Sequence, residues 1–190
     1  MALVLASQSP RRRQLMELIT ADFEVQVSQV DEHGITAPDP AALAGALAKA
    51  KCLAVSALRP GDIVIGSDTV VDCGGTVLGK PADEAEARQM LEMLSGRVHL
   101  VHTGVCLAKG QKTDVFVHTS KVEFFPLSRE EIDAYVATKE PYDKAGGYGI
   151  QGKGSLLVKG IHGDYFNVMG FPVALAARKM RKYFNFTDNK

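Results

Sequence analysis

Side chains that could bind an anion cluster near the start of the chain, at Ser7, Ser9, Arg11 and Arg12. Ser9 and Pro10 are typical of a helix start, where the first backbone N–H groups have no partner within the helix. Such N–H groups bind phosphate, and the two guanidinium groups add paired donors that match phosphate oxygens. We therefore expect a phosphate site here, although an ordinary capped helix with solvated arginines would show the same residues.

Acidic side chains at two places in the sequence could bind a metal ion or accept a proton. Asp68 follows the apolar run 63–65, where we expect a strand to end. A carboxylate in that place could ligate a divalent cation or take a proton from water. Asp31 and Glu32 follow a second strand-like stretch, 23–27. The alternatives are a turn aspartate that caps its own backbone and the charges of a solvated loop.

Two lysines and a glycine-rich segment offer further polar contacts. Lys51 lies at the edge of an apolar helical stripe, and Lys80 follows a glycine in LGKP. The segment 144–152, KAGGYGIQG, cannot form a regular helix and exposes backbone beside Tyr148 and Gln151. A tyrosine ring can stack on a base, and an amide both donates and accepts hydrogen bonds, as reading a base edge requires. The alternatives are two surface lysines and a simple tight bend.

The composition excludes several classes of protein and of site. Twenty-two basic and 22 acidic residues cancel, so the chain offers no general attraction to nucleic acid or to an anionic membrane. The three cysteines lie far apart, and the five histidines form no HxH or HxxxH pair. We therefore expect reduced thiols in a cytoplasmic protein, with no zinc site, disulfide framework, leader or membrane span.

The elements that must position these residues alternate between strands and helices at the start of the chain. Capping residues predict helices that begin at Ser9, Asp39 and Ser128. The stretch 99–125 is rich in strand-forming residues. This order predicts one α/β domain over 1–190, built on a curved mixed β-sheet with flanking helices.

Motifs in a fixed order resemble those of the Maf family of nucleoside triphosphate pyrophosphatases. They are, in chain order, LASQSPRRRQLM, QVDE, ALAKAK, IGSDTVV, LGKP, LSGRVHLVHTGV and EPYDKAGGYGIQGKG. The resemblance extends over nearly the whole chain. It implies the Maf/inosine-triphosphatase-like fold with a cleft between two lobes, and hydrolysis of a nucleoside triphosphate at the α-phosphorus with release of pyrophosphate. It also implies a divalent cation, Mg²⁺ or Mn²⁺, a cytoplasmic location and a homodimer.

The resemblance also implies roles for the candidate residues. Asp68 becomes the proton acceptor that activates water, and Asp31, Glu32 and Asp68 become the candidate metal ligands. A triphosphate gathers several negative charges, so a cleft that holds it needs cationic side chains as well as a metal. The implied phosphate ligands are Ser7, Ser9, Arg11, Arg12, Lys51 and Lys80.

Three positions, Arg11, Thr69 and Gln151, resemble the subgroup of the family that acts on dTTP and UTP. A sister subgroup directed at 7-methyl-GTP has tryptophan, glutamine and glutamate at the matching places. An amide at Gln151 suits the O4 and N3–H edge of uracil or thymine. The alternatives are the same chemistry on other triphosphates, such as modified pyrimidines or inosine triphosphate, and a nucleotide-binding regulator of cell division with little turnover.

Overall fold

The structure is a computed structural model that describes residues 1–186, and within them the chain builds a mixed sheet of seven strands. The strands are β1 (Leu3–Leu5), β2 (Glu24–Val25), β3 (Ile63–Cys73), β4 (Thr76–Leu78), β5 (Val98–Lys109), β6 (Lys112–Phe124) and β7 (Val158–His162). Their order is β2-β1-β3-β5-β6-β7, with β4 paired to β3 outside this path. β1 is parallel to both neighbours, and the other pairs are antiparallel. The expected mixed sheet is confirmed. Of the domain expected over 1–190, residues 187–190 lie outside the described residues.

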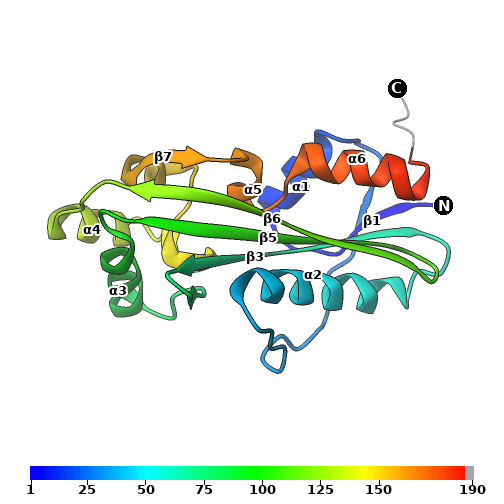
Figure 1. The fold of residues 1–190 in the computed structure, drawn as a ribbon, viewed down its shortest axis with the longest axis horizontal. Helices are drawn as coiled ribbons and strands as arrows, with labels where there is room; N and C mark the ends of the chain where they lie inside the picture. The colour runs from blue at the N-terminus through cyan, green and yellow to red at the C-terminus, as the bar shows by residue number, and fades with distance from the viewer. Residues whose placement is uncertain (187–190) are drawn as a thin grey trace.

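Helices flank the sheet on both faces (Figure 1). They are α1 (Pro10–Glu17), α2 (Pro40–Ser56), α3 (Glu84–Leu94), α4 (Arg129–Val136), α5 (Tyr165–Met169) and α6 (Val173–Phe184), with 3₁₀ segments η1 (Glu140–Asp143), η2 (Ala145–Gly147) and η3 (Gly152–Leu157). α2 covers one face, whereas α1, α5 and α6 lie on the other. Within residues 1–186, no helix combines the length and apolar character needed to cross a membrane.

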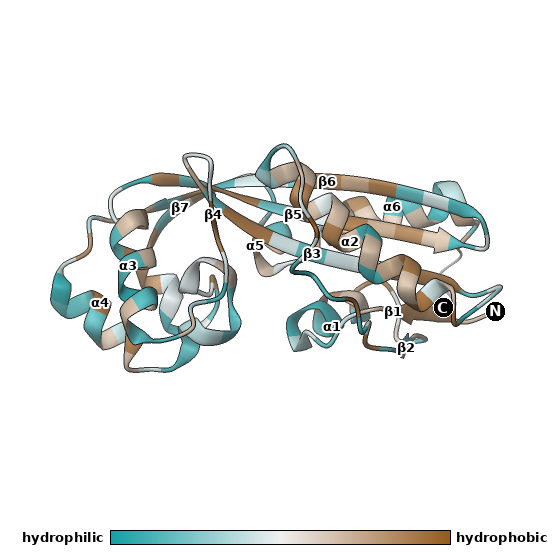
Figure 2. Ribbon diagram, turned by 90° about the horizontal axis from the view of Figure 1, so that it is seen from below, coloured by the Kyte–Doolittle hydropathy of each residue, from teal (hydrophilic) through white to brown (hydrophobic). Residues whose placement is uncertain are grey.

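Two lobes share this one sheet. The long strands β3, β5 and β6 run through both halves of the molecule (Figure 2). One buried core joins β1, α1 and α6 to the sheet, and another joins α3 and α4 to the far ends of β5 and β6. The boundary between two such cores is where a cleft can form across a continuous sheet.

The helix starts confirm the predictions made from capping residues. Ser9 Oγ accepts a hydrogen bond from the backbone N–H of Arg12 at 3.4 Å, and Asp39 caps α2 at 2.7 Å. Ser128 and Glu131 exchange both bonds of a capping box ahead of α4. These contacts span three residues each, so they depend on local sequence alone.

The strand that carries Asp68 corrects a prediction. We expected an interruption at 66–68, but β3 runs unbroken from Ile63 to Cys73, so Asp68 lies in its middle and not at its end. The reason is pairing, because β3 is hydrogen-bonded to β5 in register from residue 64 to residue 72. A rigid strand therefore holds the Asp68 backbone.

Three short elements also differ from the sequence patterns. The alternating stretch 23–27 forms only the two-residue β2, because its partner β1 is itself three residues long. The structure adds β7 and the five-residue α5, which no sequence pattern predicted.

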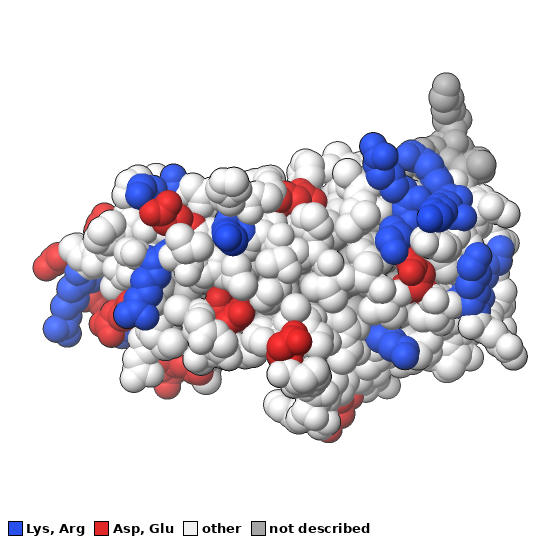
Figure 3. Space-filling view, in the orientation of Figure 1, with Lys and Arg blue, Asp and Glu red and all other residues white. Residues whose placement is uncertain are grey.

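α6 presents an apolar face to the core and a basic end to the surface. Ala176, Met180 and Phe184 are buried, whereas Arg181 and Lys182 stand in the last turn. Positive side chains there complement the partial negative charge of the helix C-terminus. Figure 3 shows Lys and Arg side chains gathered over this helix, so the neutral total charge of the chain hides a local basic surface.

The close approach of α2 to the sheet predicts a large loss of stability on Gly104→Ala. A Cβ at Gly104 would lie 2.2 Å from the backbone oxygen of Ala44 in α2, so the helix would have to move off β5. Overpacking of this kind costs about 1–3 kcal/mol, and we expect the upper end because the obstacle is backbone. Urea unfolding measures the change. The control is Gly160→Ala in β7, where nothing lies within 4 Å of the added Cβ. Equal stability of the two variants would contradict the prediction.

Candidate active site

A cleft of about 1240 Å³ opens between the two lobes. Its walls come from the β1–α1 turn, the loop after β2, α2, β3, the segment after β4 and the 3₁₀ segments η1 to η3. The structure brings all the sequence-predicted site residues to this cleft: Ser7, Ser9, Arg11, Arg12, Asp31, Glu32, Lys51, Lys80, Asp68, Thr69 and Gln151. The chain therefore gathers in one cavity side chains that are up to 144 residues apart in sequence, from Ser7 to Gln151.

Lys51 links two carboxylates from different elements. Its Nζ lies 2.5 Å from Asp68 Oδ1 and 3.0 Å from Glu32 Oε2. The side chains of Lys51 and Asp68 are only 15% and 14% exposed, so solvent screens their attraction less than at the surface. Within residues 1–186, the second oxygen of Asp68 has no hydrogen-bond partner. That oxygen can therefore accept a further hydrogen bond.

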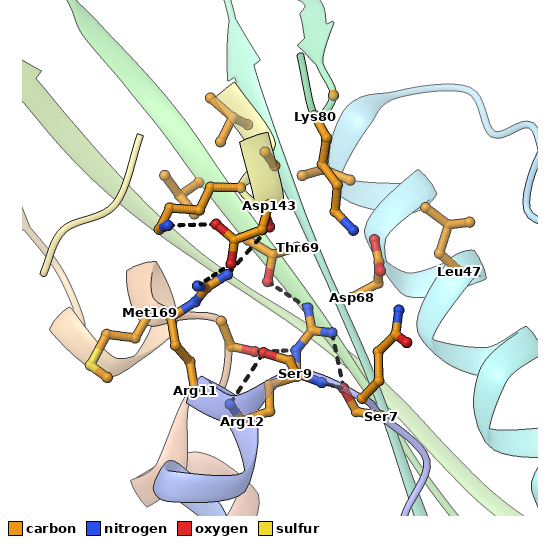
Figure 4. Close-up of a pocket in the computed structure, with 18 of the residues that line it drawn as sticks. Ser7, Ser9, Arg11, Arg12, Leu47, Asp68, Thr69, Lys80, Asp143 and Met169 are labelled. Atoms are coloured by element: carbon orange, nitrogen blue, oxygen red, sulfur yellow. Dashed lines mark hydrogen bonds and ion pairs between the residues drawn. The ribbon is translucent and has the colours of Figure 1, made fainter. Parts of the chain in front are cut away.

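The guanidinium of Arg12 makes three hydrogen bonds beside the β1–α1 turn. It donates to the backbone oxygen of Gly170 at 3.0 Å, to Thr69 Oγ1 at 3.1 Å and to Ser7 Oγ at 3.5 Å (Figure 4). Burial lowers the pKa of Arg12 from its ordinary value, and the charge of Asp68 opposes that shift. These partners are neutral, so an anion in the cleft would stabilise the buried charge.

Arg11 reaches from α1 to η1, just before the glycine-rich segment. Its Nη1 lies 2.9 Å from Asp143 Oδ2 in η1. Asp143 also contacts Lys144 Nζ at 2.5 Å. Burial would raise the pKa of Asp143, but the hydrogen bonds from Lys144 and Arg11 outweigh it and lower the pKa below its ordinary value. The pair joins segments 132 residues apart at one end of the cleft.

The two serines shape the turn as well as lining the cleft. Ser9 Oγ caps α1, and Ser7 Oγ accepts from the backbone N–H of Ser9 at 3.2 Å. A hydroxyl that accepts a hydrogen bond still has its own O–H to donate. Both serines therefore remain able to donate to an anion.

The remaining candidates differ in how firmly they are held. Lys80 extends toward Asp68 (Figure 4), and Gln151 is exposed with no hydrogen bond of its side chain within residues 1–186. Tyr148 corrects an expectation, because its ring packs edge to face against His99 and Phe124 and is only 5% exposed. Its hydroxyl lies 2.7 Å from His99 Nε2, so the ring has little surface left to stack on a base.

The chain is similar to known proteins over nearly its whole length. A family model described as Maf-like protein matches residues 2–183. The chain belongs to the Maf family. The Maf protein is 48% identical over 180 residues to a dTTP/UTP pyrophosphatase of Bacillus cytotoxicus, covering 95% of this chain and 94% of that protein. It is 46% identical over 181 residues to a dTTP/UTP pyrophosphatase of Bacillus cereus, covering 95% of both chains.

Among solved structures, the Maf protein is similar to one from Mycobacterium abscessus described as nucleoside-triphosphatase / dITP/XTP pyrophosphatase. The TM-score is 0.48 and the sequence identity is 12%, with 98% of this chain and 100% of that chain covered.

The acidic residues of the Maf protein fit a divalent cation held partly by substrate. The ammonium group of Lys51 already lies between the carboxylates of Glu32 and Asp68, so these oxygens converge on a place for positive charge. Mg²⁺ commonly uses one or two carboxylates and completes its shell with water and substrate phosphate. Asp31 fits less well, because its Oδ1 accepts from the backbone N–H of His33 at 3.0 Å. Within residues 1–186, no three His, Cys, Asp or Glu side chains form a closed metal site.

Sequence reasoning missed two carboxylates of this Maf protein, Asp143 and Glu140. Both line the cleft, and both stand in the quoted motif EPYDKAGGYGIQGKG. Asp143 pairs with Arg11, whereas Glu140 binds the backbone N–H groups of Lys153 and Gly154, just after the glycine-rich segment. Acidic residues next to a glycine-rich loop were the available signal, because exposed N–H groups need an acceptor.

Proposed function

We propose that this protein hydrolyses dTTP and UTP to the nucleoside monophosphate and pyrophosphate. The observation that carries the proposal is the cleft that Asp68, Lys51, Arg11 and Arg12 line together. The names of the Bacillus relatives support the same activity over nearly the full length of the chain. The test is a panel of canonical and modified nucleoside triphosphates with pyrophosphate release as the readout.

The proposed phosphate ligands surround the triphosphate with donors. Arg11, Arg12, Lys51 and Lys80 supply positive charge, and the O–H groups of Ser7 and Ser9 supply neutral donors. Fixed cations matter because negative charge shifts toward the leaving pyrophosphate as the bond breaks. Lys51 would have to exchange part of its contact with Asp68 for a phosphate oxygen.

The proposed hydrolytic step uses Asp68 as a general base. The free Oδ2 accepts a proton from water while the water oxygen forms a bond to the α-phosphorus. The bond between the α-phosphorus and the bridging oxygen breaks, and pyrophosphate leaves with that electron pair. Lys51 orients the carboxylate through Oδ1, which leaves Oδ2 as the oxygen for the water.

Asp68 and Glu32 would hold Mg²⁺ or Mn²⁺, with Asp31 as a third candidate whose Oδ1 already accepts a backbone hydrogen bond. When bound, such a cation would neutralise charge on the phosphate oxygens.

We also propose that the protein forms a homodimer. Light scattering of the purified protein would test this.

Gln151 is proposed to read the pyrimidine, so Gln151→Glu is expected to lower kcat/KM for dTTP and UTP. The substitution replaces an amide N–H donor to O4 with a negative carboxylate. A carbonyl left without its donor costs about 1–3 kcal/mol, or about 5- to 150-fold. Steady-state kinetics with dTTP, UTP, CTP and 7-methyl-GTP measure the change.

The matched control is Gln111→Glu, the same substitution in the exposed turn between β5 and β6. It should leave kcat/KM unchanged for all four substrates. If Gln151→Glu preserves the ratios between the four substrates, this residue does not read the base.

The second candidate is a nucleotide-binding regulator of cell division with little turnover. The free oxygen of Asp68 argues against it, because a pure binding site has no need of a proton acceptor. Tight binding of dTTP in the presence of Mg²⁺ without pyrophosphate release would favour this alternative.

A further inference from the structure

The segment that carries Gln151 must be held in place from outside. Gln151 is exposed, and the chain around it consists of short 3₁₀ segments with glycines at positive φ. Gly152 has a φ of +67°, and Gly146 has a φ of +71°. An amide that discriminates between bases needs a fixed position, because a mobile donor could adapt to either edge.

The Glu140 carboxylate binds the backbone just after Gln151. Oε1 accepts from the backbone N–H of Lys153 at 3.1 Å, and Oε2 accepts from the backbone N–H of Gly154 at 3.3 Å. A Cβ at Gly152 would lie 2.8 Å from Oε1, so the carboxylate and the segment fit closely. Both oxygens therefore bind backbone N–H groups two and three residues after Gln151.

Neighbouring residues fix the main chain of Glu140. Its backbone oxygen accepts from Lys144 Nζ at 2.6 Å, and its N–H donates to Thr138 Oγ1 at 3.2 Å. The hydroxyl of Tyr135 in α4 binds the N–H of Gly149, on the other side of Gln151, at 3.1 Å. The glycine-rich segment is thus bound to α4 and η1 on both sides of Gln151.

We propose that Glu140 is a specificity-positioning residue, whose carboxylate holds the 151–154 backbone so that the Gln151 amide meets the pyrimidine edge. The inference deepens the proposed function and rests on it for the kind of ligand. A role for Glu140 in catalysis or metal binding fits the geometry less well, because both carboxylate oxygens already accept backbone hydrogen bonds.

The test compares binding of dUTP and dCTP analogues with an α,β-imido bridge, which cannot be cleaved. Glu140→Gln puts an amide NH₂ against one of the two N–H donors, and Glu140→Asp keeps the charge but is one methylene too short to reach both. Loss of a hydrogen bond to a charged group corresponds to a change of about 10- to 150-fold in an equilibrium constant. In Glu140→Gln we expect the preference for the dUTP analogue over the dCTP analogue to decrease by a factor in that range. In Glu140→Asp we expect a smaller decrease. Amide exchange at Lys153 and Gly154 should accelerate in both variants.

The control is Glu123→Gln on β6, which removes an exposed ion pair with Lys159 outside the cleft. It should keep the wild-type preference. Four results would overturn the inference: unchanged preference in Glu140→Gln, equal weakening for both analogues, wild-type behaviour of Glu140→Asp, and unprotected Lys153 and Gly154 amides in the wild type. A wild type that binds the dUTP analogue selectively but releases no pyrophosphate from dTTP would refute the proposed function alone, because this comparison needs no turnover.

Discussion

Asp68→Asn is expected to lower pyrophosphate release from dTTP about 100- to 10,000-fold, the range typical for loss of a general base. Asparagine keeps the size of the side chain but cannot accept the proton from water, and it is a poorer ligand for a divalent cation. The fold should survive, because Asp68 Oδ1 contacts a single lysine and β3 is held by its pairing with β5. Steady-state turnover and thermal unfolding of the purified variant measure both effects.

Asp72→Asn is the matched control for that substitution. Asp72 is a buried carboxylate on the same strand, but it lies outside the cleft, where it binds the backbone N–H of Gly75 at 2.6 Å and contacts His102. Its turnover should stay near that of the wild type even if its stability falls. Near-wild-type turnover by Asp68→Asn would show that another group accepts the proton.

Lys51→Met is expected to lower kcat about 100- to 1,000-fold for every triphosphate, whatever the base. The methionine keeps much of the aliphatic stem but removes the cation that orients Asp68 and faces the phosphates. It also leaves Glu32 and Asp68 without the positive charge between them. Turnover of dTTP, UTP and CTP at saturating substrate measures the loss.

Lys49→Met provides the comparison, because Lys49 is an exposed lysine on the same helix and does not line the cleft. Its turnover of dTTP, UTP and CTP should equal that of the wild type. A loss confined to one base in Lys51→Met would assign Lys51 to base recognition and contradict its role at the phosphates.

The elements that the sequence predicted well are those that depend on neighbouring residues. The starts of α1, α2 and α4 follow from side-chain caps that span three residues, as at Ser9 and Ser128. Such contacts form wherever the same few residues occur together, so their outcome can be inferred without the rest of the chain.

The identity of the candidate residues was also accessible from sequence, because their types and order resemble the Maf motifs and each of them lines the cleft. Their partners were not accessible. Lys51 lies between Glu32 and Asp68, and Arg11 pairs with Asp143 from 132 residues away. Ion pairs of this kind form only after the sheet order has placed β3, α2 and η1 around one cavity.

Tertiary packing also decided the two points where local patterns misled. Glycine and aspartate are poor strand formers, which suggested a break before Asp68, but pairing with β5 and the close approach of α2 favour a continuous β3. Tyr148 has the type of a stacking residue, but the second core buries its ring beside His99 and Phe124. Local propensities amount to about 1 kcal/mol or less per residue, so burial and strand pairing outweigh them. Residue chemistry and order therefore indicated what the cleft binds, whereas long-range packing decided which side chains are free to act in it.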